Sequence, residues 1–216
     1  MVNPEVQSEV GKQVEEKRAQ LIQEAQSAVE ETRKALDALT QGKKDEALAS
    51  LERATGQLNI IVARDPKLAF APVRVATIVR DFYASPAVAK IAVNQARDFL
   101  RDGRVQQART VLERLASEVE IQVLRIPLAT YPEAIKAIVP LIDTGKIEEA
   151  KNALQTVLNT LVIDRYVLSL PILQARAMLN EAEKLADKSN RTAEENKKLH
   201  DFIEEARREL QLGEVL

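Results

Sequence analysis

The sequence contains no cysteine and no tryptophan, and it has a single histidine, His200. Without cysteine the chain can form no disulfide, no thiolate metal site and no cysteine nucleophile. One histidine excludes a metal site built from several histidines of one chain. The phosphate-binding loop, the dinucleotide fingerprint and the HExxH pattern are also absent. We therefore expect no catalytic residues, no cofactor and no bound metal, and we expect that the protein is not an enzyme.

Aromatic residues and net charge are low as well. Four Phe and three Tyr are too few for the stacking platforms of single-strand-binding proteins. Lys and Arg total 31 against 33 for Asp and Glu, and the net charge of −2 predicts no nucleic-acid partner. No apolar run reaches the roughly 18 residues of a membrane-spanning helix, so we expect no stable membrane insertion. The first ten residues show no signal-peptide pattern.

The first 40 residues read as one long helix. Apolar and small residues recur in alternating steps of four and three, which indicates a helical seam flanked by charged side chains. A helix over residues 1–40, starting near residue 4, would be roughly 54 Å long at 1.5 Å per residue. Such a length favours either a break near Gly11 or a projection towards a partner. The seam comprises Val14, Arg18, Leu21, Ala25, Ala28, Thr32, Ala35 and Leu39.

This alanine-rich seam is too thin to stabilise an isolated helix. It either folds back along its own chain or meets the same helix of a second subunit. We expect part of it to overhang the shorter helices that follow, and therefore expect a symmetric homo-oligomer, with a dimer favoured.

A helical hairpin is expected over residues 171–216. One apolar stripe precedes a turn at Asn190, and a second stripe follows it. Thr192 and Glu195 form the T-x-x-E pattern of a capping box at the start of the last helix. The stripes are Ile172, Ala175, Leu179, Ala182 and Ala186, and then Leu199, Phe202, Ile203, Ala206 and Leu210.

Three related segments lie between these ends, within residues 32–179. Each has the pattern aliphatic-x-x-Gly-(Lys/Arg)-x-x-x-Ala-x-x-x-Leu, centred on Gly42, Gly103 and Gly145. Glycine takes the left-handed conformation that ends one helix, and the next helix runs back antiparallel. The pattern predicts three helix-Gly-helix repeats with positive φ at each glycine. The repeat-equivalent leucines should be almost fully buried: Leu51, Leu58, Leu112, Leu154 and Leu161.

An apolar run follows the second helix of each repeat and leads to Pro72, Pro132 or Pro171. Residues before proline favour extended geometry, so we expect a short extended link there. The first link carries an extra segment. Residues 67–84 fit a short strand as well as a helix, and their conformation is left open.

Charged residues interrupt the most apolar runs of the repeats. Arg64 and Arg125 both stand 22 residues after a repeat glycine (64−42 and 125−103). Buried charges require partners, so Arg64, Arg125, Asp164 and Arg165, with Tyr166 beside them, form a candidate ion-pair cluster. One interpretation is a polar pocket that binds a small anion or senses pH. The other, which we favour, is bracing between the repeats. His200 reads as a solvated surface histidine.

These features predict an all-α fold: an irregular array of antiparallel helical hairpins with tetratricopeptide-like turns, forming one domain over residues 1–216. Tetratricopeptide repeats themselves have a regular period and aromatic positions, which this chain lacks. The sequence more closely resembles the YfdX family of bacterial proteins. The resemblance rests on the repeated Gly-(Lys/Arg)-x-x-x-Ala units, on Ile126-Pro127-Leu128 and on Ser85-Pro86. It covers roughly residues 32–179.

The resemblance implies a protein of the periplasm, connected with stress responses that include acid stress, and without an established enzymatic activity. It carries over no catalytic motif. A cytoplasmic location is the alternative. We expect a binding protein with protein clients, chaperone-like and stress-related. The alternative function is small-ligand binding in the polar pocket between the repeats.

Overall fold

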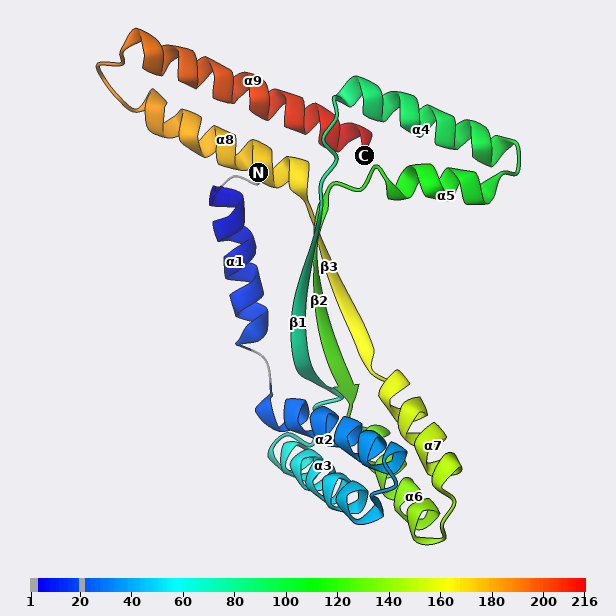
Figure 1. Ribbon diagram of the computed structural model, residues 1–216. Coiled ribbons are helices and arrows are strands. Elements are labelled where there is room, and N and C mark those ends of the chain that lie inside the picture. The colour runs from blue at the N-terminus through cyan, green and yellow to red at the C-terminus, as the bar shows by residue number, and fades with distance from the viewer. Residues whose placement is uncertain (1–3, 20–21) are drawn as a thin grey trace. The chain divides into compact units, whose positions relative to one another are not determined.

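The computed structural model describes residues 4–19 and 22–216, which divide into two compact units (Figure 1). Unit 1 contains residues 4–13, 77–121 and 166–216, and unit 2 contains the described residues of 14–76 together with 122–165. The elements of the described residues are α1 Pro4–Arg18, α2 Gln23–Thr40, α3 Lys44–Arg64, β1 Phe70–Arg80, α4 Pro86–Arg101, α5 Val105–Glu113, β2 Glu118–Pro127, α6 Tyr131–Asp143, α7 Ile147–Asn159, β3 Val162–Ser169, α8 Leu170–Ala186 and α9 Ala193–Val215.

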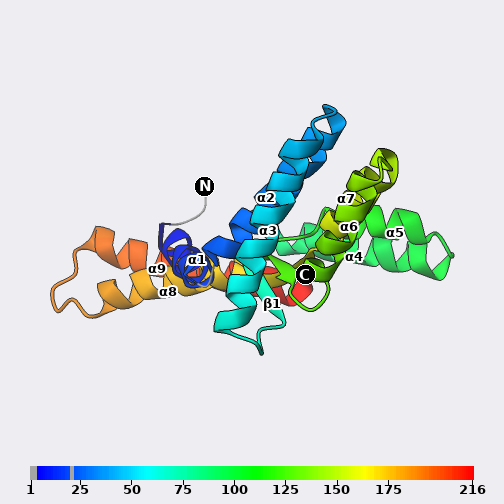
Figure 2. The ribbon, with the colours of Figure 1, turned by 90° about the horizontal axis from the view of Figure 1, so that it is seen from below.

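Unit 2 is built from two helical hairpins, α2–α3 and α6–α7, which pack against each other. Helix α2 lies beside α3 in both views (Figures 1 and 2). Between the hairpins, α2 contacts α7 and α3 contacts α6. Small residues such as Ala28, Ala35 and Ala47 let the helix backbones approach closely, and aliphatic side chains fill the remaining space. The larger members of this core are Leu39, Leu51, Leu58, Ile61, Ile126, Leu128, Tyr131, Ile135, Ile138, Ile142 and Leu154.

Unit 1 contains the hairpins α4–α5 and α8–α9 and residues 4–13 of α1. Helix α8 packs along α9, and α4 also contacts α9. Its aliphatic core is smaller than that of unit 2 and comprises Val6, Val119, Leu170, Leu173 and Ala177. The Thr192 hydroxyl and the Glu195 carboxylate cap the start of α9 reciprocally, which confirms the predicted capping box.

The three repeat glycines adopt the conformation that the sequence predicts. Gly42, Gly103 and Gly145 have φ values of 75°, 74° and 76°. At the first turn the backbone N–H of Lys43 donates to the Ala38 carbonyl at 2.9 Å, and equivalent bonds close the other two turns. These bonds define Schellman motifs, which satisfy the last carbonyls of a helix only when the residue after its cap is left-handed.

A three-stranded antiparallel sheet is present, so the all-α prediction is wrong in that respect. The strand order is β1-β2-β3. The strands lie only partly in the predicted links: β1 begins in the first link and continues through the open segment 67–84, part of which is therefore strand. β2 ends before the second link, and β3 reaches the third link only at its last residues. Pro72 lies within β1, whereas Pro132 and Pro171 stand in the first turns of α6 and α8 as expected. These segments are rich in β-branched residues, which favour strands.

The predicted single helix over residues 1–40 is two helices. Gly11 lies inside α1, and the interruption falls between Arg18 and Gln23. There Ile22 has an extended backbone, and its N–H donates to the Pro72 carbonyl of β1 at 3.0 Å. In a continuous helix the same N–H would donate to a carbonyl of the preceding helical turn. The seam residue Leu21 lies outside the described residues. The α2 part of the seam is buried inside unit 2.

Burial of the repeat leucines follows the prediction only in part. Leu51, Leu58 and Leu154 are buried, whereas Leu112 is exposed and Leu161 is half-buried. In the last hairpin Ile172 and Leu179 are exposed, because α8 turns the face with Leu173 and Ala177 towards the core.

Candidate functional site

The polar residues singled out in the sequence are distributed over several places. Arg125 on β2 lies next to Asp164 on the neighbouring strand β3, with 2.8 Å between Nε and a carboxylate oxygen. Both side chains are partly buried, so the pair is less screened than a surface ion pair. The arrangement joins two strands of the sheet inside unit 2. Arg165 is exposed and Tyr166 is half-buried on the same strand.

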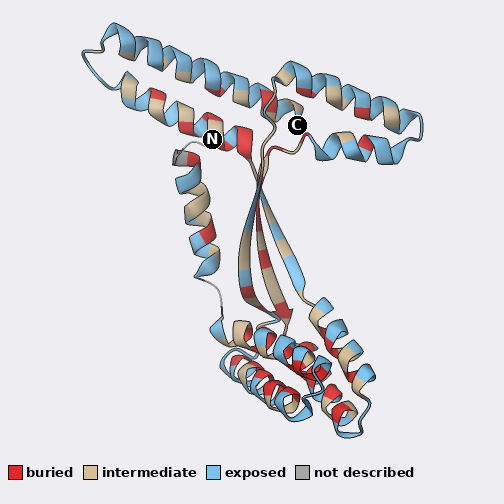
Figure 3. Cartoon of the chain, in the orientation of Figure 1, coloured by how far each residue is buried: buried red, intermediate tan, exposed pale blue. Residues whose placement is uncertain are grey.

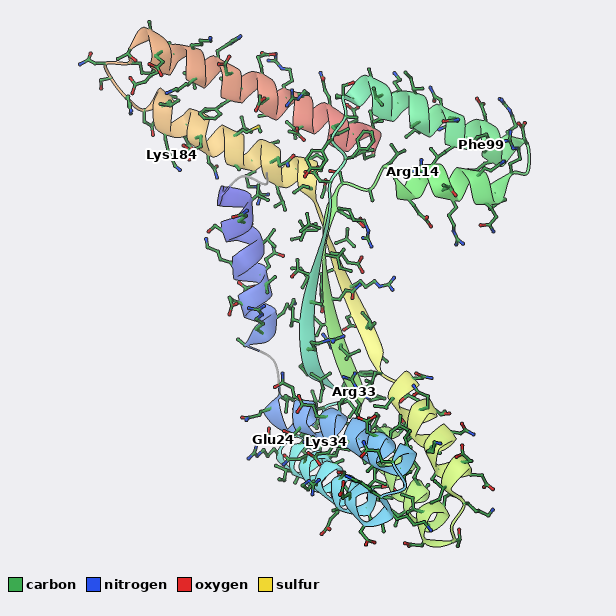
Figure 4. The ribbon with its side chains drawn as sticks, in the orientation of Figure 1. Glu24, Arg33, Lys34, Phe99, Arg114 and Lys184 are labelled. Carbon is green, nitrogen blue, oxygen red and sulfur yellow. The ribbon has the colours of Figure 1, made fainter. Side chains whose placement is uncertain are left out.

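Arg64 forms a different ion pair. It stands at the last residue of α3 and pairs with Glu24 in the first turn of α2. Figure 4 labels Glu24 at that end of α2. A hydrogen bond from its own backbone N–H, and then one from the Arg64 guanidinium, hold the pKa of Glu24 below its usual value. This pair fastens the open ends of the α2–α3 hairpin. The equal spacing of Arg64 and Arg125 from their glycines therefore does not place them in one ion pair.

A charged cluster that the sequence reasoning missed lies in unit 1. Arg80, the last residue of β1, donates from Nη1 to Glu118 at 2.7 Å and to Glu120 at 2.9 Å. Glu120 is only 5% exposed. Hydrogen bonds to the two carboxylates, chiefly Glu120, raise the pKa of Arg80. Side chains two apart on a strand share a face, so the Glu-x-Glu pattern was the signal available in the sequence.

A cavity of about 380 Å³ in unit 1 is bordered by the segment after β1 and by α9. The Tyr83 hydroxyl donates to Asp81, and that interaction raises the pKa of Tyr83. Burial raises the pKa of Glu209, and the nearby carboxylates of Asp81 and Glu205 add to the effect while Arg208 opposes it. The cavity therefore carries more negative than positive charge.

An open groove of about 720 Å³ runs between α3 and α6 in unit 2. Its floor is aliphatic, with Leu48 and Leu51 from α3 and Val139 from α6. Glu52 and Lys136 are among the charged residues of its border. An aliphatic floor with charged edges suits an apolar segment of another chain more than a polar metabolite.

Within the described ranges, no helix is long and apolar enough to cross a membrane, and no three His, Asp or Glu side chains are grouped so as to hold a metal ion. His200 is exposed on α9.

The sequence model of the YfdX protein family matches residues 28–167, well over half of the chain. The chain belongs to the YfdX family. A solved structure of Salmonella Typhi YfdX has a TM-score of 0.47 and 18% sequence identity with this chain, and the match covers 69% of this chain and 93% of that one. A comparison with curated protein sequences found no match.

The YfdX match includes all three glycine turns and ends inside β3. It also contains the Arg125–Asp164 pair, the Arg80 cluster and the α3–α6 groove. Helices α1, α8 and α9 lie outside the matched YfdX segment.

Proposed function

We propose that this YfdX-family chain is a non-catalytic, chaperone-like binding protein that holds apolar segments of partly unfolded client proteins. The observation that carries the proposal is the open groove between α3 and α6, floored by Leu48, Leu51 and Val139. Unfolding clients expose aliphatic side chains, and removing these from water is worth about 25 cal/mol per Å². The charged residues on its border keep the protein soluble when no client occupies the groove.

Membership of the YfdX family supports a proposal for where and when the protein works. We propose that the protein works in the periplasm during stress, acid stress included. Fractionation of cells that express the native gene tests the location, because an exported chain appears in the osmotic-shock fraction and a cytoplasmic one does not.

The function is tested by suppression of heat-induced aggregation of citrate synthase. Thr55→Arg places a long charged side chain in the groove without removing a core residue, because Thr55 borders the groove and is only half-buried. The matched control is Thr156→Arg on α7: both threonine hydroxyls donate to the carbonyl four residues earlier, and Thr156 lies away from the groove lining.

We expect the wild type and Thr156→Arg to suppress light scattering and Thr55→Arg to suppress it several-fold less, with all three melting alike. Equal suppression by both variants would place the client elsewhere. No suppression by the wild type would reject the chaperone-like function.

A second candidate function is the binding of a small cationic ligand in the unit 1 cavity. The cavity favours it because the carboxyls of Asp81 and Glu209 both line it; burial is the main cause of the raised pKa of Glu209, and a bound cation would offset the cost of ionising that partly buried carboxyl. A melting-temperature screen with aliphatic diamines and spermidine tests this function. A ligand of this site should raise the melting temperature of the wild type and not that of Glu209→Gln.

A further inference from the structure

The three glycine-turn hairpins share one sequence pattern, but only two of them pack against another hairpin of that pattern. In unit 2 the first helix of each hairpin contacts the second helix of the other, since α2 contacts α7 and α3 contacts α6. This reciprocal arrangement is the one that a two-fold axis produces between identical partners. Hairpin α4–α5 has the same glycine turn, and its main helical contact outside the hairpin is with α9.

Two repeat positions are buried in the hairpins of unit 2 and exposed in hairpin α4–α5. The position nine residues after the glycine holds Leu51, Leu112 and Leu154, which are 1%, 46% and 0% exposed. The position three residues before the glycine behaves in the same way. Leu39 and Ile142 are buried there, whereas Leu100 is 49% exposed.

The two helices nevertheless approach closely inside each hairpin. The alanine five residues after the glycine is fully buried in all three hairpins, as Ala47, Ala108 and Ala150. The exposure of Leu100 and Leu112 therefore arises from the lack of a hairpin alongside, and not from loose closure of α4 on α5. Figure 3 shows these two helices mostly in the colour of exposed residues.

We propose that the α4–α5 hairpin docks on the α4–α5 hairpin of a second copy of this chain, in the reciprocal arrangement that α2–α3 and α6–α7 adopt in unit 2. Helix α4 of one copy would then lie along α5 of the other, covering Leu100 and Leu112. The occupant is a second copy because the surface that fits this repeat face in unit 2 is another hairpin of the same repeat.

The border of this interface is more polar than that between the hairpins of unit 2. Arg97 and Arg109 occupy the repeat positions that hold Leu36 and Leu48 in the first hairpin. Two-fold docking of arginine-bordered faces gives a small aliphatic centre with a charged rim, so we expect a reversible dimer and not an obligate one. The proposal differs from a dimer made through the N-terminal seam, because the α2 face of that seam is already buried in unit 2.

The first test measures the mass of the full chain by sedimentation equilibrium across a hundredfold dilution. Leu112→Arg removes an exposed aliphatic group from the interface centre. The matched control is Leu179→Arg on α8, since Leu179 is also 46% exposed. We expect wild type and Leu179→Arg to reach about 48 kDa, twice 24.0 kDa, and Leu112→Arg to dissociate at least tenfold more readily.

The second test measures disulfide cross-linking between chains, which is clean because the natural sequence has no cysteine. Chains carrying L100C are mixed with chains carrying L112C and oxidised. Because α4 lies along α5 of the partner, the disulfide between the two kinds of chain should form faster than that between two L112C chains. A monomeric wild type at every concentration, or unchanged association of Leu112→Arg, would overturn the proposal. The client-binding groove lies in unit 2, so the citrate synthase assay can fail or succeed independently of this result.

Discussion

Arg80 Nη1 lies 2.9 Å from the carboxylate of Glu120, a side chain that is buried in unit 1. Removing the guanidinium leaves a buried carboxylate with one partner fewer, and a buried charge is costly when its partner is lost. We expect Arg80→Leu to lower the melting temperature more than Arg74→Leu, which removes an exposed arginine from the same strand. In Arg80→Leu, adding Glu120→Gln should restore part of the loss. Equal effects of the two arginine substitutions would show that the cluster adds no stability.

The glycine turns make a prediction about backbone conformation alone. A side chain at Gly103 would meet no atom within 4 Å, so the cost of Gly103→Val comes from its φ of +74°. We expect a loss of about 1–2 kcal/mol in unfolding free energy, because a β-branched residue is strained there. The control is Gly56→Ala inside α3, where open space and helical φ predict a gain of about 0.5–1 kcal/mol. Chemical denaturation measures both.

Core packing in unit 2 predicts a large effect at Leu154. This side chain is fully buried between the two hairpins, and its truncation leaves a cavity. Leu154→Ala should lower the unfolding free energy by about 2–5 kcal/mol. Leu179→Ala, at an exposed position of α8, should cost well under half as much. A loss below about 0.5 kcal/mol at Leu154 would contradict the hairpin packing.

The capping box of α9 predicts a pH dependence of stability. Hydrogen bonds from Lys188, and then from the Thr192 backbone N–H, lower the pKa of Glu195 from 4.5 to about 2. A carboxyl whose pKa is depressed by folding stabilises the native state above its unfolded pKa. That contribution is therefore complete above about pH 5 and is lost as the pH falls from 4.5 towards 2.

We expect Glu195→Gln to be less stable than wild type at pH 6, with the difference shrinking as the pH falls through this window. Substituting the neighbouring Glu194 does not test the capping box, because Glu194 pairs with Lys198 and not with the start of α9. A difference that stays constant down to pH 2 would mean that the Glu195 charge contributes nothing.

Local patterns carried most of what could be predicted. Each glycine turn depends on residues within about ten positions of Gly42, Gly103 or Gly145, so its geometry could be read from the sequence. The sheet could not, because an apolar run after a helix fits a buried strand as well as more helix. Its strands become recognisable only when their neighbours in the sheet are known.

The predicted burial of Leu112 is wrong, and Arg64 lies apart from the Arg125–Asp164 pair, for a related reason. Repeat equivalence places Leu112 on the same face as Leu51 but does not say whether a second hairpin lies beside that face. Arg64 ends a helix of 21 residues, whereas α5 ends at Glu113 and leaves Arg125 in a strand. Equal spacing along the chain therefore gave unequal positions in the fold.

The interleaving of the two units along the sequence has a consequence for synthesis on the ribosome. Unit 2 has all its residues once position 165 has emerged, whereas unit 1 waits for the end of α9. Chains fold as their segments appear, and contacts distant in sequence form late. We therefore expect a nascent chain in which the four helices of unit 2 are ordered first. During that interval the aliphatic face of α4 and α5 is already outside the tunnel and near the same segment of neighbouring chains on a polysome.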